Sequence, residues 1–98
     1  MFYVYVLQSS ADQKMYTGYT YNLKERLISH NAKRSSATRN RGPLRVIYFE
    51  GCLNKKDALQ REKYLKTAWG KRYIKNRLKN YFYGHSEIPT DLTWPREM

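Results

Sequence analysis

Long apolar runs, cysteine pairs and acidic residues are all scarce in this sequence, and each scarcity excludes a class of protein. The longest apolar run is a handful of residues near the N-terminus, far short of the roughly 20 that cross a bilayer. We therefore expect no transmembrane helix and no signal peptide. The one cysteine, Cys52, cannot form an internal disulfide or a zinc cluster. A single thiol suits a reducing compartment, so we expect a cytoplasmic protein.

The scarcity of acidic residues leaves a strongly basic chain. Against 8 Asp and Glu stand 19 Lys and Arg, a formal net charge of +11 on 98 residues. Such an excess attracts polyanions, of which nucleic acid is the commonest and an anionic membrane the second. The 41% hydrophobic and 15% aromatic content supports a core and excludes a fully disordered chain. We expect one domain, residues 1–83, followed by an irregular tail, residues 84–98.

Hydrophobic periodicity predicts three strands and three helices. In chain order they are strand 2–8, strand 14–19, a helix from Leu23 to about Lys33, strand 44–50, a second helix, Gly70 as a break or tight junction, and a third helix to about Tyr83. The short first connection predicts a hairpin, and the helical return places the third strand in the same sheet. The expected fold class is α+β: a three-stranded antiparallel sheet flanked by helices, in the order β-β-α-β-α-α.

Two cation-capable side chains break the apolar face of the first predicted helix. Arg26 and His30 share the i, i+3, i+4, i+7 stripe with Leu23 and Leu27. A residue on that stripe faces the core or its edge. We therefore expect both side chains to point inward or to lie along the rim of the core.

A carboxylate breaks the apolar face of the second predicted helix. Glu62 lies three residues after Leu59 and three before Leu65, so it should be partly buried. Burying an unpaired carboxylate costs several kcal/mol, and a cation should lie beside it: Arg26, a lysine or a metal ion. The pattern leaves a structural ion pair and a metal site equally open.

Tyrosine is abundant, with ten residues in the chain. Half of them belong to the first hairpin and its approach to the helix: Tyr3, Tyr5, Tyr16, Tyr19 and Tyr21. Most strand tyrosines are half-buried packing residues, which is the ordinary expectation here. Alternation nevertheless places Tyr3 and Tyr5 on one face, and hairpin pairing brings Tyr16 near them. Two phenols could therefore converge close to Arg26 and His30.

Phenols, a guanidinium, an imidazole and a carboxylate together suit chemistry on a phosphodiester. Such a reaction needs cations on the phosphate oxygens, a base for the attacking water and a sink for the charge of the leaving oxygen. One carboxylate can hold one hydrated Mg²⁺ or Mn²⁺, because magnesium keeps several of its waters. A two-metal site needs more acidic residues than this sequence places together.

These residues resemble the signature of the GIY-YIG nuclease superfamily. The first motif appears as Tyr-Val-Tyr at 3–5 and the second as Tyr-Thr-Gly at 16–18, and the likeness continues through segments 20–30 and 58–66. It covers about residues 2–80. The chain is most similar to small stand-alone proteins related to the GIY-YIG nuclease domain of excinuclease ABC. The resemblance implies the fold of that superfamily and a hydrolase acting on DNA.

The resemblance also implies roles for individual residues. Tyr16 would be the general base or would position the attacking water, and Tyr5 would be its partner at the scissile phosphate. Arg26 would stabilise the pentavalent phosphate. His30 would assist proton transfer or bind the phosphate.

Further roles implied by the resemblance concern the metal and the backbone. Glu62 would hold a single Mg²⁺ or Mn²⁺ ion, Gly18 would allow close backbone approach, and Asn76 would fill the late asparagine position. Two positions depart from the superfamily's pattern. Tyr3 replaces the glycine of the first motif, and Tyr19 stands where many members carry a lysine.

Basic side chains flank the predicted site on two segments and would bind DNA backbone without reading its sequence. The predicted DNA-binding residues are Lys33, Arg34, Arg39, Arg41, Arg45, Lys63, Lys66, Lys71 and Arg72. The resulting hypothesis is a metal-dependent DNA endonuclease, acting in repair or recombination. The alternatives are a non-catalytic DNA- or RNA-binding module of the same fold and a basic protein that binds an acidic partner. We expect neither membrane binding nor an obligate protein partner.

Overall fold

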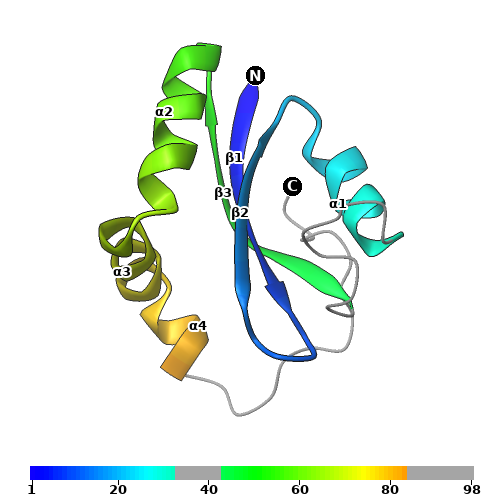
Figure 1. Ribbon diagram of the computed structural model, residues 1–98, viewed down its shortest axis with the longest axis vertical. Coiled ribbons are helices and arrows are strands. Elements are labelled where there is room, and N and C mark those ends of the chain that lie inside the picture. The colour runs from blue at the N-terminus through cyan, green and yellow to red at the C-terminus, as the bar shows by residue number, and fades with distance from the viewer. Residues whose placement is uncertain (33–42, 84–98) are drawn as a thin grey trace.

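The first strand lies at the centre of the sheet (Figure 1). The computed structural model describes residues 1–32 and 43–83. Strand β1 (Phe2–Ser9) pairs antiparallel with β2 (Met15–Thr20) on one side and with β3 (Leu44–Cys52) on the other, giving the order β2-β1-β3. The predicted three-stranded antiparallel sheet and the α+β class are therefore confirmed.

Helices cover both faces of the sheet (Figure 1). Helix α1 (Leu23–Asn31) lies on one face, and α2 (Lys55–Leu65), α3 (Ala68–Arg77) and α4 (Lys79–Tyr83) lie on the other. Successive strand side chains point to opposite faces, so β1 contributes to two separate cores. Tyr5 and Leu7 pack with the leucines of α1, whereas Val4 and Val6 pack with α2 and α3.

Polar side chains mark where the helices begin. The Asn22 side chain accepts a hydrogen bond from the Glu25 backbone N–H at 3.1 Å and donates one to the Glu25 carboxylate at 3.1 Å. The three-residue spacing of Asn22 and Glu25 in the sequence is itself typical of such a helix start. Asn54 caps α2, and Thr67 caps α3 by accepting from the Gly70 N–H at 3.1 Å.

The helical layer differs from the prediction at the junction of α2 and α3. Helix α2 ends at Leu65 rather than at Gly70, and α3 begins at once behind the Thr67 cap. Gly70 is the contact point: a Cβ there would lie 2.7 Å or less from backbone atoms of Tyr64 and Leu65. Only glycine lets α3 begin so close to α2. A further break then separates α4 from α3, so the described helices number four rather than three.

Two apolar positions of the predicted helices are exposed rather than buried. The buried stripe of α2 runs through Ala58 and Leu65, seven residues apart, which turns Leu59 outward. Trp69, predicted for the second helix, belongs to α3 and is 67% exposed. Glu62 still lies on the buried stripe, because it is four residues after Ala58 and three before Leu65.

Two predicted segments lie outside the described residues. They are residues 33–42, within which most of the loop predicted at 34–43 falls, and the predicted tail at 84–98, so the boundary proposed between domain and tail stays a prediction. Within 1–32 and 43–83, no helix has the length and apolar character needed to span a membrane.

Candidate active site

A buried hydrogen bond joins the first strand to the first helix. Tyr5 Oη lies 3.2 Å from His30 Nε2, and both residues are buried. Burial raises the pKa of Tyr5, while the Arg26 charge lowers it and the Glu62 charge raises it to smaller extents. Burial, helped by Arg26, lowers the pKa of His30 from its ordinary 6.5. At neutral pH the pair therefore consists of a neutral phenol and a neutral imidazole.

Gly18 leaves the space that the Tyr5 ring occupies. The two residues face each other across the β1–β2 ladder. A Cβ on residue 18 would lie 3.0 Å or less from Cε2, Cζ and Oη of Tyr5. The ring therefore lies across the bare backbone of β2 and reaches the edge of the sheet. This is the close backbone approach that the second motif implies.

The hydrogen-bonded pair forms one wall of a cavity of about 300 Å³. The cavity runs from α1 across edge strand β2 to the start of α3, and its lining residues are Tyr5, Met15, Tyr16, Thr17, His30, Lys66 and Lys71. Tyr16 lies opposite Leu7 in the ladder, on the same face as Tyr5. Its hydroxyl is buried and has no hydrogen-bond partner among the described residues. The predicted convergence of the two phenols near His30 is therefore present in the structure.

Glu62 lies beside this cavity and is paired with a lysine of its rim. Its carboxylate is 3.2 Å from Lys66 Nζ, one helical turn further on, and the side chains are 21% and 56% exposed respectively. The partial burial predicted for Glu62 and its need for a cation are both met. An exposed pair at this spacing contributes little stability, so another cation can displace Lys66 at small cost.

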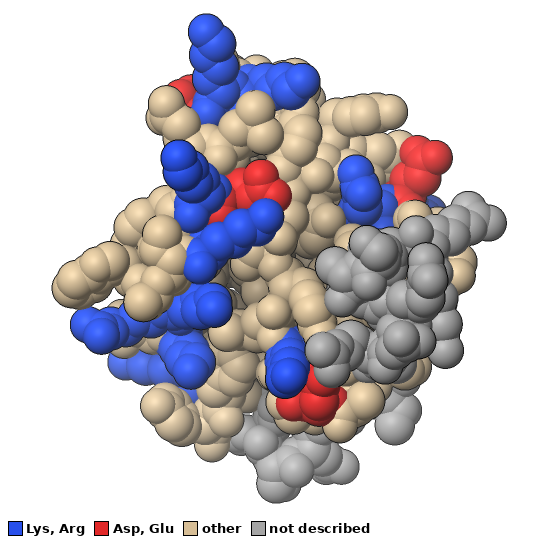
Figure 2. All heavy atoms as spheres, in the orientation of Figure 1, with Lys and Arg blue, Asp and Glu red and all other residues tan. Residues whose placement is uncertain are grey.

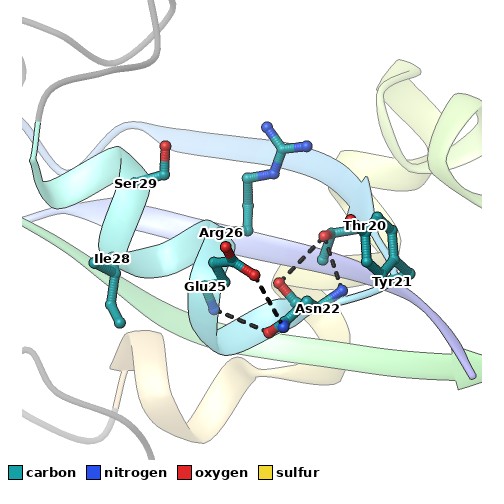
Figure 3. A pocket seen from close by; sticks show the side chains of 7 residues that line it. All are labelled: Thr20, Tyr21, Asn22, Glu25, Arg26, Ile28 and Ser29. Atoms are coloured by element: carbon teal, nitrogen blue, oxygen red, sulfur yellow. Dashed lines mark hydrogen bonds between the residues drawn. The ribbon is translucent and has the colours of Figure 1, made fainter.

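Arg26 lines a different hollow. It is exposed on α1 and borders a groove of about 430 Å³. The other residues of this groove are Thr20, Tyr21, Asn22, Glu25, Ile28 and Ser29. Figure 3 shows Arg26 and Ser29 extending from one side of α1, whereas Ile28 extends from the other. Neither Arg26 nor Glu62 lines the cavity formed by Tyr5, Tyr16 and His30. The Arg26 charge nevertheless lowers the pKa of both Tyr5 and His30, and the Glu62 charge raises the pKa of Tyr5.

The basic surface lies over α2 and α3 (Figure 2). Of the predicted DNA-binding residues, those exposed there are Lys63, Lys66, Lys71 and Arg72. The sequence predicts Lys66 and Lys71 only as contacts to the DNA backbone. In the structure both also line the cavity, because the tight α2–α3 junction brings them there. Nothing in helical periodicity alone predicts this, since the two lysines belong to different helices.

Other predicted residues are placed elsewhere. Arg45 lies in β3, within the predicted strand, opposite Gln8, and its guanidinium Nη1 is buried rather than exposed to DNA. Asn76 is exposed on α3 and lines neither hollow, so its predicted catalytic role gains no support from position. The four remaining predicted DNA-binding residues lie outside the described residues: Lys33, Arg34, Arg39 and Arg41.

The donor set around the cavity is poor in carboxylates. Within the described part of the chain, no three His, Cys, Asp or Glu side chains come together as a metal-binding group. Glu62 is the acidic residue whose charge reaches Tyr5. One carboxylate fits a hydrated Mg²⁺ or Mn²⁺ ion and does not fit a cage built from protein ligands.

The lowered pKa of His30 predicts a pH dependence of stability. Between that pKa and 6.5 the unfolded chain binds a proton that the folded chain does not, so folding stability rises with pH there. Stability should therefore be full above pH 6.5 and should fall as the pH drops below it. Urea unfolding at pH 7 and pH 5 measures this. His30→Gln should remove this part of the loss, whereas His85→Gln, the other histidine, should not; equal effects would contradict the assignment.

Comparison with known proteins agrees with this arrangement. A family model described as the GIY-YIG catalytic domain matches residues 1–75. The UPF0213 protein CPE1444 of Clostridium perfringens is 45% identical over 67 residues, which cover 67% of this chain and 71% of the relative. The UPF0213 protein OB0043 of Oceanobacillus iheyensis is 48% identical over 61 residues, covering 61% of this chain and 70% of the relative.

A solved structure is also similar. The solution NMR structure of the UPF0213 protein BH0048 from Bacillus halodurans superimposes with a TM-score of 0.53 at 26% identity, covering 92% of this chain and 99% of that one. The names of these relatives assign no activity. The matched domain, the relatives and the shared fold confirm the resemblance noted in the sequence: the chain belongs to the GIY-YIG nuclease superfamily and is similar to its UPF0213 members.

Proposed function

We propose that this protein is a divalent-metal-dependent endonuclease that hydrolyses phosphodiester bonds in DNA, in cytoplasmic repair or recombination. One observation carries the proposal. The cavity at β2 places two phenols and a neutral imidazole beside two lysines, at the edge of a basic helical surface. Those are the groups that a phosphate and an attacking water need within one site.

The lysines and Arg26 would receive the DNA strand. Lys66 and Lys71 line the cavity, and their ammonium groups suit the non-bridging oxygens of a phosphate. Arg26 lies close enough for its charge to change the pKa values of both Tyr5 and His30. A phosphate bound between these groups would lie next to the phenols. Contacts of this kind bind DNA irrespective of sequence and weaken steeply with salt.

The two phenols would have different tasks. Tyr5 is held as a neutral phenol, because burial raises its pKa, and its bond to His30 fixes its direction. With His30 in the tautomer whose Nε2–H donates to the Tyr5 oxygen, the single Tyr5 O–H would be free to donate a hydrogen bond to the phosphate. Tyr16 has a buried hydroxyl without a hydrogen-bond partner among the described residues, so its hydrogen-bonding capacity is unused. Tyr16 would orient the attacking water, or take its proton as a phenolate, while the water oxygen bonds to phosphorus and the bond to the leaving oxygen breaks.

Glu62 is the residue that would hold a divalent ion. The ion would supply positive charge for the leaving oxygen. Glu62 also binds Lys66 at 3.2 Å, so in the loaded protein Lys66 would release the carboxylate and turn to the phosphate. This ion pair equally favours the second candidate function, a DNA- or RNA-binding module without catalysis, in which Lys66 keeps Glu62 occupied.

A nicking assay distinguishes the two functions. Supercoiled plasmid and branched DNA are incubated with the protein in Mg²⁺ or Mn²⁺, and in EDTA, while binding is followed on the same DNA. The nuclease cuts only with metal and binds with or without it. Tight binding without cutting in either metal would establish the non-catalytic module instead.

Tyr16→Phe tests the role of the orphan hydroxyl. The change removes one oxygen that makes no hydrogen bond to the described protein, so folding should be unaffected. Cleavage should fall by about 100-fold or more, the usual contribution of a positioned acid–base group. The measurement is the single-turnover rate in Mn²⁺. A variant that keeps the full rate would remove Tyr16 from the mechanism.

A further inference from the structure

Trp69 is a large aromatic residue that the fold does not bury. It is 67% exposed in the first turn of α3, although tryptophan is on average among the highly buried residue types. The core contacts of this helix are made by Gly70 and Ile74 instead. The indole therefore contributes little to packing, and its exposure favours a binding role at the surface.

An arginine accompanies the exposed ring. The guanidinium carbon of Arg72 lies 5.0 Å from the centroid of the Trp69 ring, in cation–π range. Both side chains are exposed on α3. An indole beside a guanidinium offers a flat apolar surface and a positive charge together. A nucleotide has the complementary pair of features, a flat base and a negative phosphate.

The charge of α3 indicates an anionic ligand. The helix carries Lys71, Arg72, Lys75 and Arg77 and no acidic residue. Lys71 lies two residues after Trp69 and lines the cavity, and Lys66, three residues before it, does the same. Residues two apart on a helix point to different sides, so the indole lies around α3 from the cavity-lining Lys71 and beside Arg72. Charge complementarity favours DNA over an apolar protein partner.

We propose that Trp69 and Arg72 form a stacking site for an unpaired nucleobase of a DNA strand bound along α3. The base would stack on the indole, and Arg72 would bind the adjoining phosphate. This inference rests on the DNA binding of the proposed function and narrows it. The DNA would be single-stranded or branched, with unpaired bases outside the cavity, because a base inside a duplex cannot present its face to the ring.

Fluorescence of Trp69 tests the stacking directly. In a Trp94→Phe background Trp69 is the sole tryptophan, since the chain has two. A short oligothymidine strand in EDTA should quench its emission, whereas an abasic strand of equal length and charge should not, and a paired duplex should quench less. Fluorescence anisotropy of labelled strands reports binding in the same samples.

The possible outcomes separate this inference from the proposed function. Binding without quenching, or equal quenching by the oligothymidine and abasic strands, would overturn the stacking site and leave DNA binding intact. No binding of any strand would overturn both. An emission change that depends on protein concentration without DNA would show that a second copy covers Trp69, which also overturns the inference.

Variants provide an independent readout. Trp69→Ala should weaken oligothymidine binding about 10-fold at fixed salt and leave the salt dependence unchanged, because stacking involves no counterion release. Arg72→Gln should reduce the slope of log affinity against log salt by about one. The matched control is Tyr83→Ala, at an aromatic residue that is 87% exposed at the end of α4, and it should change neither quantity. A loss equal to that of Trp69→Ala would contradict the site.

Discussion

Replacing Glu62 by glutamine should lower the cleavage rate at least about 100-fold while DNA binding stays the same or becomes tighter. Glutamine keeps the size of the side chain and loses the negative charge that would hold the divalent ion. The cavity rim then carries Lys66 without its carboxylate partner, so its attraction for phosphate rises. A loss of rate with undiminished binding separates a metal-holding role from a DNA-binding one.

The measurement pairs single-turnover cleavage with binding of Mn²⁺ in the absence of DNA, followed by electron paramagnetic resonance. Glu62→Gln should lose both. Asp57→Asn is the matched control, because Asp57 is an exposed acidic residue in the first turn of the same helix. It should keep the wild-type rate and metal binding. Full activity of Glu62→Gln would show that the carboxylate only pairs with Lys66.

Gly18→Ala should lower folding stability by about 1–3 kcal/mol, as overpacking does in a tight site. The direction of this change in folding stability is informative, because alanine in a strand is normally favoured over glycine by about 0.5–1 kcal/mol. Here the added methyl would meet the Tyr5 ring at Cε2, Cζ and Oη. The ring must move, and its bond to His30 breaks. Cleavage should fall on the order of 100-fold, as expected when a catalytic group is displaced by about 1 Å.

Gly51→Ala is the internal control for this substitution. Gly51 pairs with β1 as Gly18 does, opposite Tyr3 rather than Tyr5. A Cβ there would meet chiefly the side chain of Met1, which is exposed and flexible. Stability should stay level or rise slightly, and the cleavage rate should be unchanged. Urea unfolding and single-turnover rates of both variants check the contrast. Equal effects would mean that strand propensity, not the Tyr5 ring, governs position 18.

Local patterns in the sequence predict the sheet and the buried pair well. Alternation along β1 correctly places Tyr5 on one face, and the hairpin register brings Tyr16 to the same face. The helical stripe correctly places His30 inward, and the Asn22 and Glu25 spacing correctly predicts the start of α1. Each of these depends on neighbours within a few residues or on one tight connection, which is the range over which such patterns act.

Contacts between elements account for what the sequence does not reveal. The end of α2 is decided by the Thr67 cap and by the backbone contact at Gly70, and only that junction brings Lys66 and Lys71 to one cavity. Arg26 likewise lies on the exposed side of α1, whose buried residues are Leu23, Leu27 and His30. Helical periodicity gives the face on which a residue lies and leaves open which hollow that face borders.

The structure also shows which side chains of the basic excess, a net charge of +11, are paired and which are exposed. Part of the basic excess is neutralised within the fold. Arg61 forms an ion pair with Glu50 and lies over the rings of Tyr64 and Tyr73, so it does not belong to the free basic surface. Two exposed lysines near the α2–α3 junction, Lys66 and Lys71, instead line the cavity. In the proposed function these two lysines would bring a phosphate to the phenols.

The most direct test of the central claim is single-turnover cleavage of a branched DNA by the wild-type protein in Mn²⁺, with binding measured on the same sample. The proposed nuclease should hydrolyse the DNA backbone in Mn²⁺. EDTA should abolish the hydrolysis and leave DNA binding intact. Saturated binding in Mn²⁺ with an intact backbone would contradict this claim, and would identify the protein as a DNA-binding module built on a nuclease fold.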